Sequence, residues 1–100
     1  MPKPLESRFQ AKVIKKIKTL WPEAIVTKLD SGHIQGIPDL LILAGKKWAT
    51  LESKRYEGAS RRPNQEWYVD KMNRMSFSRF ISPENMEEVF GELKAFLDDL

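Results

Sequence analysis

The chain has 100 residues, no cysteine and a formal net charge of +3 at pH 7, and 41% of its residues are hydrophobic. This length and composition fit one globular domain, and the lack of cysteine excludes disulfides, thiolate zinc sites and cysteine nucleophiles. No apolar run approaches the roughly 20 residues that span a bilayer, and the first ten residues lack the apolar segment of a signal peptide. We therefore expect a single cytoplasmic domain over residues 1–100, without a membrane partner.

The charge is unevenly distributed along the chain. Residues 1–82 contain 16 Lys/Arg and 8 Asp/Glu, a balance of +8, whereas residues 83–100 contain one Lys and six acids, a balance of −5, and the two balances sum to +3. A basic body with an acidic tail favours a polyanionic partner such as DNA. A charged surface that only contacts solvent is the alternative interpretation.

The first part of the chain predicts a helix followed by two strands. Apolar residues recur at helical spacing over residues 5–21, and Pro22 ends the helix because the residue before a proline is pushed out of helical geometry. The β-branched segment 24–29 predicts a strand. The almost entirely apolar run 39–43 predicts a second strand that is covered on both faces.

The second part begins with a hairpin. Gly45-Lys46 suits a tight turn, and residues 48–55 form the returning strand. After a polar loop at 56–64, we expect a helix from Pro63 to about Met75, a strand at 77–82 and a final helix that begins at Pro83. The order α-β-β-β-α-β-α predicts an α/β fold with a central mixed sheet flanked by helices.

The hairpin brings two acids together. If Gly45 and Lys46 are the turn residues, paired residue numbers sum to 91, so Asp39 stands opposite Glu52 with Cβ atoms about 4.5–5.5 Å apart. Lys54 lies two residues beyond Glu52 and therefore points to the same face. A cross-strand ion pair on a solvated face of the sheet is the structural alternative. The convergence of two carboxylates and an ammonium favours a catalytic site.

Such a site suits a divalent cation. Opposed carboxylates repel each other, and Mg²⁺ prefers oxygen ligands, which are usually one or two carboxylates, waters and substrate phosphate oxygens. The cation polarises the scissile phosphate and lowers the pKa of a bound water, while Lys54 orients or deprotonates the attacking water. We expect Asp39 and Glu52 to bind Mg²⁺, with Mn²⁺ as a substitute.

The segments GIPDLLIL (36–43) and TLESK (50–54) resemble the motif of the PD-(D/E)XK nuclease superfamily. The predicted element order resembles the restriction-endonuclease-like core of that superfamily along essentially the whole chain. The GIPDLL spelling and the segment NQEWY (64–68) further resemble the VRR-NUC group, which includes small phage proteins related to Holliday-junction resolvases. The resemblance implies an endonuclease from a bacterial cell or a phage-infected host.

The resemblance also implies two further catalytic residues. Glu6, in the first predicted helix, matches a glutamate that the family often supplies to the metal site. Gln65 matches the family's glutamine on the helix after the Glu-x-Lys strand. Glu6 could instead simply suit the helix dipole at its N-terminus, and Gln65 could cap its helix or be exposed.

Basic residues near the predicted site are candidates for DNA binding. Arg55, Arg61 and Arg62 lie in the loop after Lys54, and such clusters bind phosphates without reading sequence. His33, the only histidine, precedes Asp39 in a glycine-rich loop and could contact phosphate, although an exposed position without a role is its simpler interpretation.

The sequence therefore predicts a magnesium-dependent endonuclease for branched or double-stranded DNA, such as a flap or four-way junction. A nucleic-acid-binding module that keeps the fold without cleavage is the alternative. We also expect a homodimer, because cutting both strands needs two sites and the family's resolvase-like members act as dimers. The chain also has more large apolar side chains than one small core can easily bury, namely Trp67, Met72, Met75, Phe77, Phe80 and Phe96. We expect the dimer interface at the last strand and its neighbouring helices.

Overall fold

The computed structural model of the chain describes residues 5–99, with side chains from Ser7 to Asp99. The elements follow the predicted order, and they are α1 (Leu5–Leu20), β1 (Ile25–Lys28), β2 (Leu40–Ala44), β3 (Lys47–Ser53), α2 (Pro63–Met75), β4 (Ser78–Ile81) and α3 (Met86–Leu97). The strands form one sheet in the order β1-β2-β3-β4. The first three strands are antiparallel and β4 is parallel to β3, so the predicted mixed sheet is confirmed.

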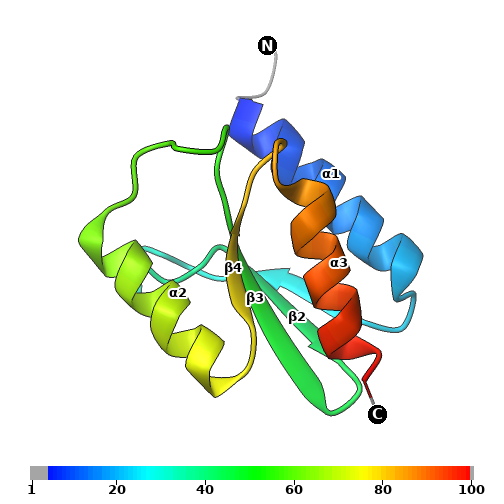
Figure 1. Ribbon diagram of the computed structural model, residues 1–100. Coiled ribbons are helices and arrows are strands. Elements are labelled where there is room, and N and C mark those ends of the chain that lie inside the picture. Colours follow the sequence, from blue (N-terminus) through cyan, green and yellow to red (C-terminus); the bar gives the residue numbers. More distant parts are fainter. Residues whose placement is uncertain (1–4, 100) are drawn as a thin grey trace.

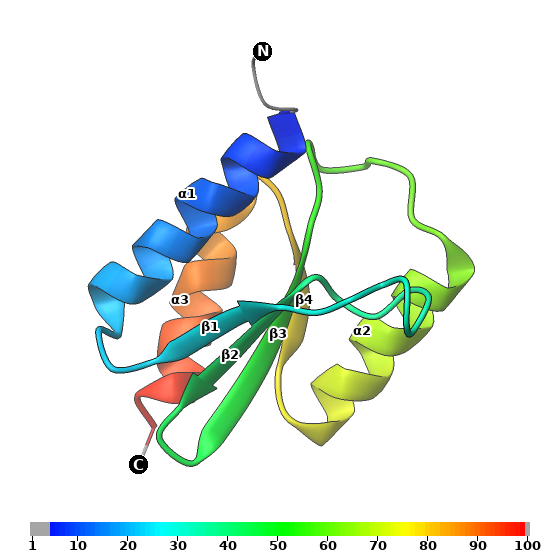
Figure 2. The same cartoon turned by 180° about the vertical axis from the view of Figure 1, so that it is seen from behind.

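The helices cover the two faces of the sheet unequally. Helices α1 and α3 pack on one face, and α2 lies on the other (Figure 1), as the view from behind also shows (Figure 2). Because side chains alternate along a strand, β2 and β3 direct one set of apolar residues toward α1 and α3. The core comprises Phe9, Val13, Ile17, Leu40, Ile42, Ala49, Leu51, Phe77, Ile81, Val89, Phe90 and Leu93. Within the described part of the chain, no helix has the length and apolar character needed to cross a membrane.

The last helix begins later than predicted, at Met86 instead of Pro83. Asn85 explains the difference. Its side-chain oxygen accepts a hydrogen bond from the Ser82 backbone N–H at 2.7 Å, and its amide donates to the Phe80 carbonyl at 3.2 Å. These contacts hold residues 83–85 in a turn, so the helix can start only after it.

The outer edge of β4 is occupied by side chains. Asn73 accepts a hydrogen bond from the Ser78 backbone N–H at 3.2 Å, and Arg79 donates to the Ser78 carbonyl at 2.9 Å. Asn85 binds the Phe80 carbonyl farther along the strand. These backbone groups are therefore already paired, and this edge is a poor template for another strand.

The apolar residues that stay exposed lie elsewhere. Phe77 is buried and Phe80, Phe96 and Met72 are half-buried, whereas Trp67 and Met75 on α2 are 56% and 63% exposed. On the sheet, Ile25 and Leu43 are paired with each other and are 61% and 41% exposed. Their face is the one that α2 covers only over β3 and β4. The uncovered apolar face, as we call it below, comprises Ile25 and Leu43.

Gly91 is an exposed residue within α3, and a Cβ placed there would meet no atom within 4 Å. Because glycine loses more backbone freedom than alanine when a helix forms, Gly91→Ala should raise the free energy of unfolding by roughly 0.5–1 kcal/mol. Chemical denaturation measures this change. The reverse substitution Ala95→Gly, at an exposed site of the same helix, is the matched control and should lower stability by a similar amount. A less stable Gly91→Ala variant would contradict the prediction.

Candidate active site

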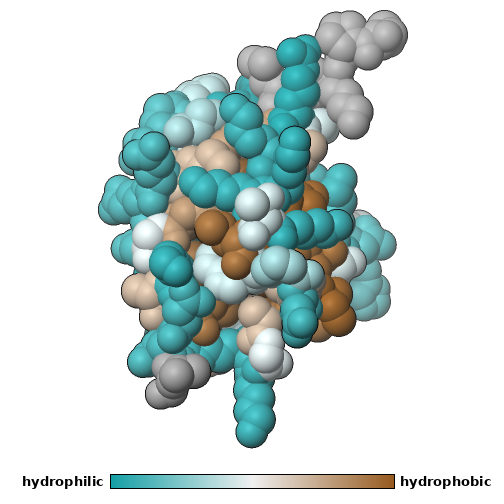
Figure 3. Space-filling model, turned by 90° about the vertical axis from the view of Figure 1, so that its right-hand side faces the viewer, coloured by the Kyte–Doolittle hydropathy of each residue, from teal (hydrophilic) through white to brown (hydrophobic). Residues whose placement is uncertain are grey.

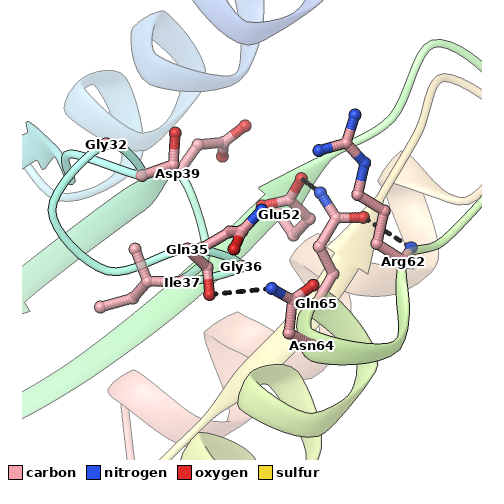
Figure 4. Close-up of a pocket in the computed structure, with 10 residues that line it drawn as sticks. Gly32, Gln35, Gly36, Ile37, Asp39, Glu52, Arg62, Asn64 and Gln65 are labelled. Atoms are coloured by element: carbon pink, nitrogen blue, oxygen red, sulfur yellow. Dashed lines mark hydrogen bonds between the residues drawn. The ribbon is translucent and has the colours of Figure 1, made fainter.

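Asp39 and Glu52 both line one pocket of about 430 Å³. The pocket lies between the loop that precedes β2, the end of β3 and the first turn of α2 (Figure 4). Its other lining residues are Ser31, Gly32, Gln35, Gly36, Ile37, Arg62, Asn64 and Gln65.

The predicted register of the hairpin is confirmed. Ala44 pairs with Lys47 and Leu40 pairs with Leu51, so each pair of numbers sums to 91. Asp39 lies one residue before β2, and Glu52 is the next residue of β3 after Leu51. Both carboxylates therefore reach the pocket from the open end of the hairpin.

Ser53 holds the Asp39 carboxylate. The Ser53 backbone N–H lies 3.2 Å from Oδ1 and 3.3 Å from Oδ2 of Asp39, and the Ser53 hydroxyl lies 3.4 Å from Oδ1. The Asp39 side chain thus accepts a hydrogen bond from the Ser53 backbone N–H at the end of the sheet. This contact explains why β2 starts at Leu40 and not at Asp39 as predicted. The contact also fixes the position of Asp39 relative to β3.

Gln65 connects Glu52 to Lys54. Its Nε2 donates to Glu52 Oε2 at 3.2 Å, and its Oε1 accepts from Lys54 Nζ at 2.8 Å. Lys54 Nζ also lies 3.9 Å from Glu52 Oε2. Because Glu52 is only 5% exposed, these charge-assisted contacts offset the cost of burying its charge. The structure therefore brings together Glu52 of β3, Lys54 directly after β3, and Gln65 of α2.

Gln65 also caps its own helix. Its Oε1 accepts a hydrogen bond from the Arg62 backbone N–H at 3.1 Å, three residues earlier in the chain. This contact satisfies a backbone donor at the start of α2. The capping interpretation is therefore confirmed, and the same amide group also contacts the two charged residues.

Lys54 lies beside the pocket and does not line it. Its Nζ donates to the Ser60 carbonyl at 3.0 Å as well as to Gln65, and its side chain is 14% exposed. The ammonium group therefore ties the loop after β3 to the first turn of α2. It also places a positive charge within 4 Å of Glu52.

A contact between the loop and α2, which the sequence did not predict, closes one side of the pocket. Gly36 has a φ of +91°, and a Cβ there would lie 2.7 Å from Asn64 Cγ. The Asn64 amide donates to the Gln35 carbonyl at 3.2 Å (Figure 4). The glycine directly before Ile37-Pro38-Asp39 was the available signal, since close backbone approach is one reason for glycine in a loop.

The predicted DNA-binding residues are not all at the pocket. Arg62 lines it. The Arg61 guanidinium instead lies over the Phe80 ring, 3.9 Å from its centroid, and lines a second pocket that contains Lys54 but neither Asp39 nor Glu52. His33 and Arg55 are exposed and do not line the pocket.

The acids suit a metal ion only in part. Within the side chains that the structure describes, no group of three or more His, Cys, Asp and Glu could hold a metal. Glu6, the third predicted ligand, belongs to α1, but its side chain lies outside the described set. Asp39 and Glu52 are still a sufficient protein contribution for Mg²⁺, which commonly takes one or two carboxylates and completes its shell with water and phosphate.

Two solved structures resemble this fold. One, named "VRR_NUC domain", has a TM-score of 0.70 and 21% sequence identity, covering 89% of this chain and 97% of its own. Another, "VRR_NUC domain protein", has a TM-score of 0.68 and 12% identity, covering 98% of this chain and 92% of its own. The chain has a VRR_NUC fold. No family model and no curated protein sequence matches it. The VRR_NUC neighbours confirm the predicted resemblance to a nuclease fold.

Proposed function

We propose that this VRR_NUC-fold chain is a metal-dependent endonuclease that hydrolyses DNA phosphodiester bonds. The observation that supports this most directly is the presence of Asp39 and Glu52 in one pocket, with Lys54 and Gln65 bonded beside them. Two fixed carboxylates next to an ammonium group match the needs of phosphodiester hydrolysis, in which negative charge builds on the phosphate.

Asp39 and Glu52 are the residues that would hold Mg²⁺ or Mn²⁺. When bound, the cation polarises the scissile phosphate and makes water a better nucleophile. Ser53 and Gln65 orient the two carboxylates before any substrate arrives, so little reorganisation is needed. Lys54 offsets charge on the phosphate or orients the attacking water, and Gln65 keeps its ammonium near Glu52.

The proposed substrate is double-stranded or branched DNA, such as a flap or four-way junction. Arg62 at the pocket, and Arg61, Arg55 and His33 on the neighbouring surface, would contribute phosphate contacts without base reading. The basic body of the chain favours such a polyanion.

A direct test is incubation of the protein with plasmid, flap, splayed-arm and four-way-junction DNA, with Mg²⁺, with Mn²⁺ and with EDTA. We expect cleavage only with a divalent ion and faster cleavage of a branched substrate. The alternative is a binding module that retains the fold without cleavage. DNA binding without any cleavage, together with a melting temperature that Mg²⁺ does not raise, would support that alternative.

The proposed enzyme works as a homodimer, since one chain carries one Asp39–Glu52 pair and cutting both strands needs two. The hydrogen-bonded side chains along β4 disfavour strand pairing there, so we move the proposed interface to the uncovered apolar face.

Leu43→Glu, which places a charge within that face, should give monomers. Light scattering at micromolar concentration tests this prediction. A wild-type mass near 11.6 kDa that persists with DNA would contradict the dimer.

A further inference from the structure

Helix α1 has a basic face that the pocket residues do not account for. Between Ser7 and Pro22 the chain has five Lys/Arg and no acid. Lys12, Lys15 and Lys18 are exposed, and their spacing of three places them on one broad side of the helix. We call these three residues the α1 ridge. Ion pairs recorded within residues 7–99 involve none of the three.

The rest of α1 is fixed in the core. Phe9 is 6% exposed, Val13 and Ile17 are fully buried, and Lys16 lies over the Phe90 ring at 4.7 Å. Because its apolar side is already packed, the helix cannot insert into a bilayer as an amphipathic membrane helix does. The α1 ridge therefore presents positive charge to a partner and no apolar surface.

The ridge begins at Lys12, about two turns from the start of α1, the helix that packs on the opposite face of the sheet from α2. Figures 1 and 2 both show the first turns of α1 beside the end of β3, the strand that carries Glu52. The side of the molecule formed by α1 and α3 carries many hydrophilic side chains (Figure 3). The neighbouring α3 exposes Glu87 and Glu88, which repel a polyanion and so restrict its binding to α1.

We propose that the α1 ridge binds the phosphate backbone of a duplex arm whose scissile strand lies in the Asp39–Glu52 pocket; this inference rests on the proposed nuclease function. From Lys12 to Lys18 the helix rises about 9 Å, and duplex DNA carries one charge per about 1.7 Å of its axis, so several phosphates pass within reach of three lysines. The contact requires an arm that extends beyond the cut site. Chain ends or short single strands would not reach it.

The test compares Lys12→Gln/Lys15→Gln with the control Lys46→Gln/Lys71→Gln. Each pair lowers the net charge from +3 to +1 and changes only exposed lysines, and Lys46 and Lys71 lie in the β2–β3 turn and on α2. Binding to labelled four-way junctions is measured by fluorescence anisotropy in EDTA over a range of salt, with arms of about 5 or about 15 base pairs. Because each lost phosphate contact removes about 0.9 from the salt slope, the ridge variant should lose about 1.8 with long arms. With short arms it should equal the wild type.

An equal loss in the control pair, or a loss that persists with short arms, would overturn the proposal, since either result reflects net charge alone. Binding of the wild type to anionic phospholipid vesicles that depends on Lys12 and Lys15, without any arm dependence on DNA, would also overturn it. The EDTA assay involves no cleavage, so it separates the two ideas. A protein that shows the arm dependence but never cuts DNA with Mg²⁺ would retain the ridge and lose the nuclease function.

Discussion

Glu52→Gln and Asp39→Asn are each expected to lower DNA cleavage by about 10²–10³-fold, with the fold intact. Each variant keeps the shape of the side chain and removes a charge that would bind the cation. The new amide oxygen at position 39 could still accept the Ser53 N–H, and the one at position 52 could still accept from Gln65, so both hydrogen bonds can survive. Single-turnover cleavage with Mg²⁺ measures the loss. Circular dichroism and thermal melting check the fold.

Glu66→Gln is the matched control for these two variants. Glu66 is exposed on α2, next to Gln65 in sequence but outside the pocket, and the substitution changes the net charge by the same amount. It should cleave at the wild-type rate. A well-folded Glu52→Gln variant with full activity would remove Glu52 from the catalytic role.

Lys54→Met tests the ammonium group by the same cleavage assay. This variant should also destabilise the protein, because the buried Glu52 carboxylate then lacks the positive charge of Lys54.

Gly36→Ala is expected to destabilise the protein by roughly 2–3 kcal/mol and to impair cleavage in the molecules that still fold. The added Cβ would lie 2.7 Å from Asn64 Cγ and 2.9 Å from the Asn64 backbone carbon, and the φ of +91° is itself unfavourable for alanine. The loop must then move away from α2. Asp39 lies three residues after Gly36, so a shift of this loop changes the shape of the pocket as well. Urea denaturation and cleavage rates measure the two effects.

Gly58 separates the two causes. Its φ of +87° is nearly the same as that of Gly36, but a Cβ there would meet no atom within 4 Å. Gly58→Ala should therefore cost only the backbone strain, on the order of 1 kcal/mol, and should leave cleavage unchanged. Equal losses of stability in the two variants would show that the contact between Gly36 and Asn64 contributes nothing.

The hairpin was the most predictable part of the site. A two-residue turn at Gly45-Lys46 determines which residues are opposite each other, and the alternation of a strand then places Glu52 and Lys54 on the same side. Because these rules involve only neighbouring residues, the sequence alone was enough to predict which residues lie opposite each other and which share a side. The same holds for the helix order and for Pro63 as the first residue of α2.

The contacts that hold the site were not predictable in this way. Asn64 reaches Gln35 across 29 positions of the chain, and Asn85 shortens the last helix by binding Phe80 and Ser82. Both asparagines make hydrogen bonds that depend on where another segment lies in space, and no periodicity encodes that. The position of Arg61 over the Phe80 ring was likewise not predictable, because it depends on where β4 lies in space.

The close spacing of the site residues has a consequence for how the protein folds. Asp39, Glu52, Lys54 and Gln65 all lie within one segment, the β2–β3 hairpin and the helix that directly follows it. A hairpin forms in about 1–10 μs, whereas the parallel pairing of β4 with β3 must wait for the whole crossover through α2. The two carboxylates can therefore meet early, before the sheet is complete, and the docking of α2 adds Gln65 and with it the bridge between Glu52 and Lys54.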